Sequence, residues 1–314
     1  MSVPEKYSFT RYLAAKKSID DRALNRSVWQ TLVGALPGSN PETPLKVLEA
    51  GAGSGTMVER MLEWGALSYA EYTALDAQTE NIDCARERLA GWGAQRGYQV
   101  EQASDERLVL CQPGRCVWVD WVAADIFDFI DDHQGKRLWD LLVAHAFLDL
   151  VDIPAALPRL FRLLRPGGLF YFTINFDGLT QFEPAIEPGL DDLIQRLYHR
   201  TMDERIIDGK PSGDSRAGRH LFGHIEKAGA TLLDAGASDW VVFPQQGGYP
   251  QDEAYFLHFI LHTIQQALAG CPEMDAGRFA DWVTERHAQV ERGELVYIAH
   301  QMDFVGRVGH DPPG

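Results

Sequence analysis

The 314-residue sequence is short of basic residues, with 29 lysines and arginines against 45 aspartates and glutamates and a formal net charge of −16. Nucleic-acid binding depends on clustered basic side chains that neutralise phosphates, so this balance argues against a nucleic-acid partner. The sequence also lacks any apolar run near the roughly 20 residues that span a bilayer, and its charged N-terminus is unlike a signal peptide. We therefore expect a cytoplasmic protein with a small-molecule partner and no membrane partner. The oligomeric state stays open.

Cysteine is scarce as well. The four cysteines include no C-x-x-C pair, and two of them, Cys111 and Cys116, flank a Pro-Gly turn. This spacing indicates neither a zinc ribbon nor a disulfide framework, and it fits a reducing cytosol. His258 and His262 lie four residues apart, but the stretch HFILH lacks the glutamate of a metalloprotease helix. We expect no metal site.

Strand-like and helix-like segments alternate from residue 45 onward. The stretches LKVLEAG, YAEYTALDAQ and WDLLVAHAFLDLV predict buried strands, and GTMVERMLEWG and NIDCARERLAGWG predict helices between them. Such alternation indicates a parallel sheet with helices on both faces. Before it, residues 8–36 predict one helix with a capping pair at Ser18 and Asp21, and a linker follows over residues 37–44. Residues 98–125 predict a β-hairpin around QPGR that leads into the third strand.

A glycine-rich turn follows the first predicted strand, in VLEAGAGSGTMVER, residues 47–60. Gly51, Gly53 and Gly55 would let a ligand approach bare backbone at the positive end of a helix dipole. The spacing is neither the G-x-G-x-x-G of dinucleotide-binding proteins nor the phosphate-loop pattern. Glu49 would repel a pyrophosphate and attract an ammonium or sulfonium. Its alternative role is to cap a helix.

Two further acidic residues end the next predicted strands. Asp76 lies 25 residues after Gly51, where a carboxylate can accept hydrogen bonds from both hydroxyls of a ribose. Asp125 could accept from an adenine amino group while Ile126 packs on the ring. Either aspartate could instead be an ordinary strand-end carboxylate, and Asp128 competes with Asp125. Read with Glu49, these residues favour a phosphate-free nucleoside that carries a cationic sulfur, namely S-adenosylmethionine.

These stretches resemble the motifs of the class I S-adenosylmethionine-dependent methyltransferases, over roughly residues 45–175, in VLEAGAGSG, TALDAQ, AADIFD, WDLLVAHAFLDLV and LLRPGGLFYFTI. The resemblance implies a doubly wound α/β fold with a mostly parallel seven-stranded sheet in the order 3-2-1-4-5-7-6, strand 7 antiparallel. It also implies S-adenosyl-L-methionine as cofactor and S-adenosyl-L-homocysteine as product. The cofactor-binding residues it implies are Glu49, Gly51, Ala52, Gly53, Gly55, Asp76, Ala77, Asp125, Ile126 and His145.

Five segments are expected along the chain. They are an N-terminal helical cap and linker (residues 1–44), the cofactor-binding half of the core (45–176), an inserted substrate lid between strands 5 and 6 (177–220), the C-terminal part of the core sheet (221–308) and a tail (309–314). We expect the cap and the lid to close over the cofactor from two sides.

The sequence says less about the methyl acceptor and the residues that bind it. Methyl transfer from a sulfonium is an in-line displacement that requires alignment and exclusion of water, and no nucleophilic side chain. For a hydroxyl or ammonium acceptor, His145 is the first candidate base and His220 the second. The alternatives are a core histidine at position 145 and a capped helix start around Asp214 or Ser215. The candidate substrate-binding residues are Asn175, Arg216, Arg219, Trp240 and Tyr12, with Arg216 or Arg219 orienting a carboxylate acceptor and Trp240 equally consistent with ordinary core.

The sequence thus predicts a methyltransferase that acts on a small molecule at an oxygen, nitrogen or carboxylate. An RNA or protein methyltransferase and a non-catalytic S-adenosylmethionine-binding protein are the alternatives. A nicotinamide-dependent oxidoreductase is disfavoured by Glu49 and by the glycine spacing.

Overall fold

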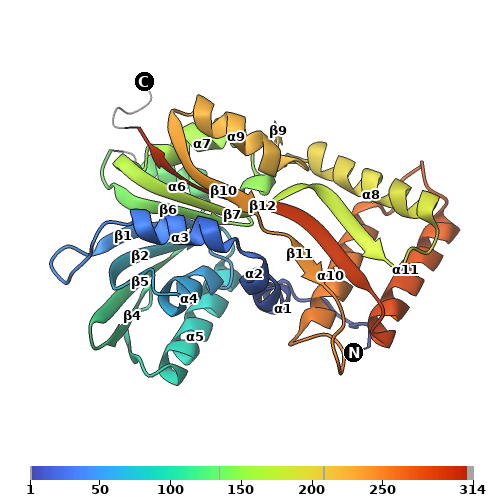
Figure 1. Ribbon diagram of the computed structural model, residues 1–314, viewed down its shortest axis with the longest axis horizontal. Coiled ribbons are helices and arrows are strands. Elements are labelled where there is room, and N and C mark those ends of the chain that lie inside the picture. Colours follow the sequence, from blue (N-terminus) through green and yellow to red (C-terminus); the bar gives the residue numbers. More distant parts are fainter. Residues whose placement is uncertain (1, 134, 208, 310–314) are drawn as a thin grey trace.

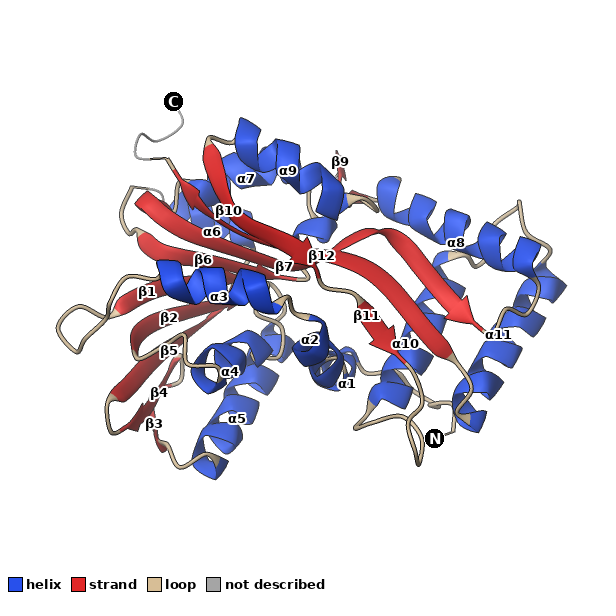
Figure 2. Ribbon diagram, viewed as in Figure 1, coloured by secondary structure: helices blue, strands red, loops and turns tan. Residues whose placement is uncertain are grey.

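The computed structural model describes residues 2–133, 135–207 and 209–309, and a mixed sheet runs through the whole molecule (Figures 1 and 2). The ten-stranded sheet has the order β10-β12-β7-β6-β1-β2-β5-β4-β3, with β11 paired to β12, and β8 and β9 form a separate pair. The strands are β1 (Leu45–Ala50), β2 (Tyr69–Asp76), β3 (Gln99–Ser104), β4 (Arg107–Gln112), β5 (Arg115–Ala123), β6 (Trp139–His145), β7 (Leu164–Glu183), β8 (Ile206–Ile207), β9 (Lys210–Pro211), β10 (Ala230–Ala237), β11 (Trp240–Val242) and β12 (Val296–Val308).

Helices cover both faces of the sheet and a third core lies at its extended end (Figure 2). The first face carries α3 (Arg26–Ala35), α4 (Thr56–Glu63) and α5 (Thr79–Gln95). The second carries α6 (Ile126–His133), α7 (Ile153–Phe161) and α9 (Ala217–Lys227). At the extended end of β7 and β12 gather α1 (Phe9–Ala15), α2 (Lys17–Ala23), α8 (Pro188–Asp203), α10 (Glu253–Ala267) and α11 (Ala276–Arg292).

The predicted strand order is present within this larger sheet. The strands expected as 3-2-1-4-5-7-6 are β5, β2, β1, β6, β7, β12 and β10, which neighbour one another in that order. The pairs β1–β2, β2–β5, β1–β6 and β6–β7 are parallel, and β12 is antiparallel to both of its neighbours. The prediction of seven strands was too low, because β3 and β4 extend one edge and β11 adds to β12.

The N-terminal segment is three helices rather than the one predicted over residues 8–36. Ser8 caps α1, and the Asn25 side chain accepts from the backbone N–H groups of Ser27 and Val28 to start α3. The predicted cap residue Ser18 lies inside α2, where its hydroxyl donates to Glu253. The breaks let α1 and α2 turn towards α10 and β11 instead of continuing along α3.

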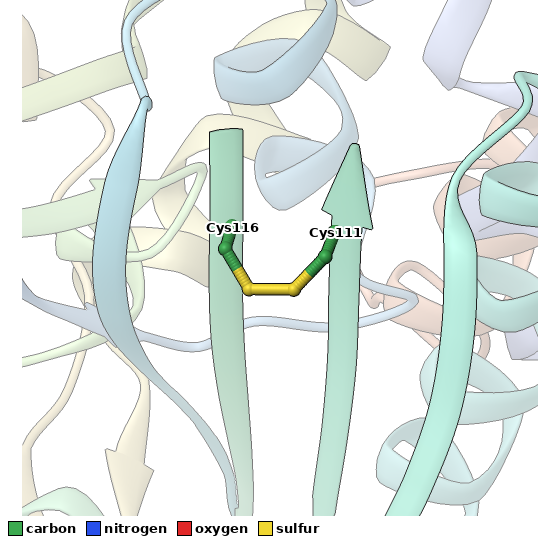
Figure 3. Close-up of a disulfide and its surroundings, with 2 residues drawn as sticks. All are labelled: Cys111 and Cys116. Atoms are coloured by element: carbon green, nitrogen blue, oxygen red, sulfur yellow. A yellow bond between two sulfur atoms is a disulfide. The ribbon is translucent and has the colours of Figure 1, made fainter. Parts of the chain in front are cut away.

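The cysteine prediction was wrong for one pair. Cys111 and Cys116 are directly opposite each other across the β4–β5 hairpin, and their sulfurs form a disulfide (Figure 3). The Pro113-Gly114 turn between them brings them into cross-strand register. Cys84 and Cys271 are free.

β7 is longer than the apolar part of the motif LLRPGGLFYFTI. It continues to Glu183 alongside β12, into the segment expected as a lid, and carries α8 outward from the sheet. Within the described ranges, no helix is long and apolar enough to cross a bilayer, and no three histidine, cysteine, aspartate or glutamate side chains cluster as metal ligands would.

Candidate functional site

A cavity of about 530 Å³ opens at the carboxyl ends of β1, β2, β5 and β6. Three turns that follow these strands form one wall, at residues 51–54, 76–78 and 124–127. The opposite wall comes from α1, α8, α10, β7, β11 and β12. In open α/β sheets, ligands bind at this edge, so the predicted cofactor motifs and the cavity coincide.

The glycine loop forms the floor of this cavity. Gly51 and Gly53 have positive φ angles of 71° and 52°, a backbone conformation that favours glycine. A Cβ atom on Gly51 would lie 2.6 Å from the Phe147 ring, and one on Gly53 would lie 3.3 Å from Leu13 of α1. The loop is therefore packed between the end of β6 and the N-terminal cap. Gly55 shapes the start of α4 and does not line the cavity.

Asp76 links two turns of the cavity wall. Its Oδ2 accepts from the Gly53 backbone N–H at 2.9 Å, and its Oδ1 accepts from the Gln78 N–H at 2.9 Å and from Asn81 Nδ2 at 3.0 Å. A carboxylate has about four acceptor positions, so three protein donors leave room for one more hydrogen bond. Ala77 lines the cavity beside it.

Asp125 caps a helix and also lines the cavity. Its Oδ1 accepts from the backbone N–H groups of Phe127 at 2.7 Å and Asp128 at 3.3 Å, which starts α6. Ile126 and Phe127 lie in the same wall and offer apolar surface to a planar ring. Asp128, the competing candidate, is exposed and does not line the cavity.

Glu49 does not lie where the sequence argument placed it. It is buried under the glycine loop, does not line the cavity, and its Oε2 accepts from the Tyr72 hydroxyl at 2.8 Å. Burial raises the pKa of Glu49 to about 8, although Tyr72 and Arg60 oppose the rise. A carboxyl group that is largely protonated at neutral pH supplies little charge to attract a sulfonium, so the predicted contact of Glu49 with the cofactor's charge was wrong.

A buried group of charges joins the N-terminal cap to the end of β6. Asp20 Oδ2 lies 2.8 Å from Lys16 Nζ, 2.9 Å from His145 Nε2 and 3.4 Å from Arg60 Nη2, and Asp20 Oδ1 accepts from Trp240 Nε1 at 2.9 Å. Burial alone would raise the pKa of Asp20, but Lys16, His145 and Arg60 lower it well below its usual range. The chain thus keeps an ionised carboxylate in the interior, held by three partners.

His145 lines the cavity with both ring nitrogens engaged. Nε2 faces Asp20, and Nδ1 lies 2.8 Å from the Thr173 hydroxyl, which fits a neutral ring that donates through Nε2 and accepts at Nδ1. Burial, together with Lys16 and Arg60, lowers the pKa of His145 to about 4, against the opposing effect of Asp20. Such a ring is a weak base at neutral pH, so the geometry fits a positioning role better than the catalytic role predicted for it.

Four predicted residues lie away from the cavity. His220 is exposed and its Nδ1 lies 2.6 Å from Asp214 Oδ2, while Arg219 binds Asp177 and is also exposed. Arg216 begins α9 at the surface, where Asp214 accepts from its backbone N–H, close to the alternative of a capped helix start. Asn175 is fully buried and donates to the Met302 carbonyl. None of the four lines the cavity.

Tyr12 and Trp240 do line it, in a wall rich in aromatic rings. The Tyr12 ring stacks on Phe259 with 4.3 Å between centroids, and Lys16 Nζ lies 5.5 Å from the Trp240 ring centre. Several other residues of the cavity wall were not predicted. Tyr198, Arg205, Tyr297 and Gln301 lie outside residues 45–175, which carry the motifs, whereas Asp149 and Phe176 lie within or next to a motif stretch without a pattern that marks them.

Comparison with known proteins agrees with this site. Residues 48–170 match a family model described as a methyltransferase domain, and a search of curated proteins found no match. Among solved structures, a Bacillus halodurans C-125 protein with a provisional assignment as a methyltransferase is 13% identical, covers 91% of this chain and 100% of its own, and has a TM-score of 0.50. An S-adenosylmethionine-dependent methyltransferase from Thiobacillus denitrificans, solved with S-adenosyl-L-homocysteine, is 13% identical with a TM-score of 0.45 over 98% and 99% of the two chains.

A third solved structure is phosphoethanolamine N-methyltransferase 2 from Haemonchus contortus, at 13% identity and a TM-score of 0.45, over 98% of this chain and 61% of that one. At 13% identity and a TM-score of 0.50, the Bacillus halodurans structure bears on the fold alone. The family match covers residues 48–170, which include the glycine loop, Asp76 and Asp125 of the cavity wall, so this part of the chain carries a methyltransferase domain.

Proposed function

We propose that this chain transfers the methyl group of S-adenosylmethionine to a small-molecule acceptor by in-line displacement. One observation carries the proposal: the glycine loop, Asp76 and Asp125 surround a single cavity that α1 and α8 close from the other side. A bound adenosine would reach Asp76 with its ribose, and Asp125 and Ile126 with its adenine. The sulfonium end would then point towards the aromatic wall.

In this proposal the chain orients the cofactor and excludes water from the methyl group. Gly51, Ala52 and Gly53 allow the cofactor to approach bare backbone, and Gly55 sets the direction of α4. Leu13 covers Gly53 from above. These contacts would exclude water from the methyl group and hold it in line with the acceptor, which is what a displacement at carbon requires.

The segments expected from the sequence fit this role. The cap over residues 1–44 supplies Tyr12, Leu13 and Lys16 to the cavity, and the lid over residues 177–220 supplies Tyr198, Met202 and Arg205. The two parts of the core, residues 45–176 and 221–308, would remain fixed while cap and lid open for exchange. Of the tail, residues 310–314 lie outside the described ranges.

The wall opposite the glycine loop, which we call the acceptor wall, is formed by side chains of α1, α8, α10, β7, β11 and β12 around an interior space. This enclosure favours a small acceptor over a macromolecule. The net charge of −16 also opposes an RNA acceptor. The test is turnover of methyl-labelled S-adenosylmethionine with pooled small amines, alcohols and acids, compared with RNA and protein pools. Labelled products only in the macromolecular pools would overturn the proposal. Binding of S-adenosyl-L-homocysteine without any turnover would leave a non-catalytic binding protein.

A further inference from the structure

We propose that the methyl acceptor is an amine, which binds as its ammonium form against Asp149 and the tyrosine hydroxyls around it. This inference rests on the proposed function and specifies its substrate class. It comes from polar atoms in the acceptor wall that have no partner in the described part of the chain.

Asp149 lies in the short helical turn Leu148–Leu150 that follows β6. This segment starts at His145, turns at Ala146 with a positive φ of 51°, and packs Phe147 against Gly51 of the glycine loop. It therefore joins the cofactor side of the cavity to the aromatic side. A group on Asp149 stands where an acceptor would meet the reacting methyl group.

The Asp149 carboxylate is incompletely satisfied. Its Oδ1 is buried and accepts no hydrogen bond from any described residue. Burial raises the pKa of Asp149 to about 6, while its own backbone N–H, Arg205 and Lys16 oppose the rise. An unpartnered buried carboxylate oxygen is costly to the fold unless a ligand supplies the missing donor.

Other acceptor atoms surround the same space. Gln301 Oε1 is buried without a partner among the described residues. The hydroxyls of Tyr12, Tyr198 and Tyr297 line the cavity and make no hydrogen bond within the described ranges. Burial is the main cause of the raised pKa values of Tyr12 and Tyr198, and the charge of Asp149 raises both further. These hydroxyls therefore lie within the electrostatic reach of Asp149.

This set of atoms selects for a donor-rich cation. A carboxylate oxygen and an amide oxygen can only accept, and an ammonium group offers up to three N–H donors where an alcohol offers one. The Tyr198 ring lines the same space, and an aromatic ring attracts positive charge. Arg205 and Lys16 line the same cavity, so a carboxylate acceptor is the competing class and enters the test directly.

The chemistry balances without a further reactant. The ammonium passes one proton to the Asp149 carboxylate, which frees the nitrogen lone pair. The lone pair forms the new N–C bond to the methyl carbon as the S–C bond breaks. The electron pair of the broken S–C bond stays on sulfur in S-adenosyl-L-homocysteine. The methylated nitrogen then carries the positive charge, and Asp149 later releases its proton to solvent.

The test measures binding of benzylamine, benzyl alcohol and benzoate to the full chain saturated with S-adenosyl-L-homocysteine. We expect wild type to prefer benzylamine by tenfold or more, and Asp149→Asn to lose most of that preference, since a charged hydrogen bond changes an equilibrium constant by about tenfold or more. Asp149→Glu should restore part of it. Asp152→Asn is the matched control, because Asp152 lies three residues away and does not line the cavity.

Affinity for S-adenosyl-L-homocysteine separates the two proposals. Suppose that this affinity is intact in wild type and in Asp149→Asn, but wild type binds benzylamine no more tightly than benzyl alcohol or benzoate. The amine inference is then overturned and the proposed function stands. Preference for benzoate, or for benzyl alcohol, overturns it in the same way. If wild type does not bind S-adenosyl-L-homocysteine, the proposed function fails and this inference fails with it.

Discussion

The Asp20 carboxylate lies 2.9 Å from Nε2 of His145, and this contact fastens the N-terminal cap to the strand end beside the glycine loop. Lys16 and Arg60 share the same oxygen of Asp20. The cap is therefore held to the core by buried charge as well as by apolar packing, and the site depends on both.

Asp20→Asn should destabilise the fold strongly. The change leaves Lys16 and Arg60 buried without their shared counter-charge, and loss of one partner in a buried ion pair costs about 3–5 kcal/mol. Denaturant unfolding followed by tryptophan fluorescence measures the free energy of unfolding. The control is Asp83→Asn, because Asp83 is exposed and pairs with the partly exposed Arg86, so its loss should cost about 1 kcal/mol or less. Equal losses in the two variants would contradict a special role for Asp20.

Glu49→Gln should leave cofactor affinity nearly unchanged. Glutamine preserves a neutral acceptor for the Tyr72 hydroxyl, and Glu49 is itself largely protonated below its raised pKa of about 8. Calorimetry with S-adenosylmethionine and S-adenosyl-L-homocysteine tests this directly. A selective loss of affinity for S-adenosylmethionine, the charged ligand, would instead restore the charge-attraction argument.

The same variant should change how stability depends on pH. The folded state keeps a proton on Glu49 between pH 4.5 and about 8 that the unfolded chain has released, so Glu49 makes stability fall as pH rises through this window. In Glu49→Gln that contribution, about 5 kcal/mol over the whole window at roughly 1.36 kcal/mol per pKa unit, should disappear. Denaturant unfolding at pH 5 and pH 8 gives the comparison. An unchanged pH dependence would mean that Glu49 is ionised in the folded state.

Turnover of an amine should fall at acid pH with a limb near pH 6. Asp149 has a raised pKa of about 6 and is active as its carboxylate, so kcat/KM should fall about tenfold per unit below that pH. Besides Lys16 and Arg205, Asp214 acts on this group, and Tyr12 and Tyr198 lie within its electrostatic reach. Steady-state kinetics from pH 4 to 9 show the limb.

The variant Asp149→Asn identifies the group responsible for that limb. It should lower kcat/KM and remove the limb near pH 6. A limb near pH 4 that persists in the variant would assign the proton transfer to His145, whose pKa is lowered to about 4.

Leu13→Ala should speed the release of S-adenosyl-L-homocysteine. Leu13 lies over Gly53 and lines the cavity, so its loss opens the cover on the glycine loop. We expect a several-fold higher dissociation rate in stopped-flow fluorescence, since removal of a few partly buried methyl groups is worth about 1 kcal/mol. Leu179→Ala, at an exposed position outside the cavity wall, is the control. Equal rates in both variants would argue against a cover at this point.

Local pattern was enough to find the cofactor wall. The glycine loop, Asp76 and Asp125 each follow a buried strand directly, and parallel strands bring their carboxyl ends to one edge. The order of the seven core strands followed from the family resemblance. The hairpin around QPGR was predicted and is the β4–β5 hairpin, but its disulfide was not, because Cys111 and Cys116 were interpreted from spacing alone, without the register of their strands.

The acceptor wall could not be predicted for a different reason. Asp20 meets His145 across 125 residues of sequence, and Tyr198 and Tyr297 come from α8 and β12, far from the motifs, although Tyr12 and Trp240 were predicted. Arg219 and His220 had a suggestive local pattern, but Asp177 and Asp214 hold them at the surface. Long-range packing, which no motif encodes, decides these positions.

Calorimetry with S-adenosyl-L-homocysteine on wild type and Asp76→Ala tests the cofactor site most directly. The variant should bind about 2–4 kcal/mol more weakly, because charged hydrogen bonds are worth about 1.5–3 kcal/mol each and Asp76 also holds the Gly53 N–H in place. Asp128→Ala, which removes an exposed carboxylate outside the cavity, should bind like wild type. Unchanged affinity in a folded Asp76→Ala protein would contradict the placement of the cofactor in this cavity.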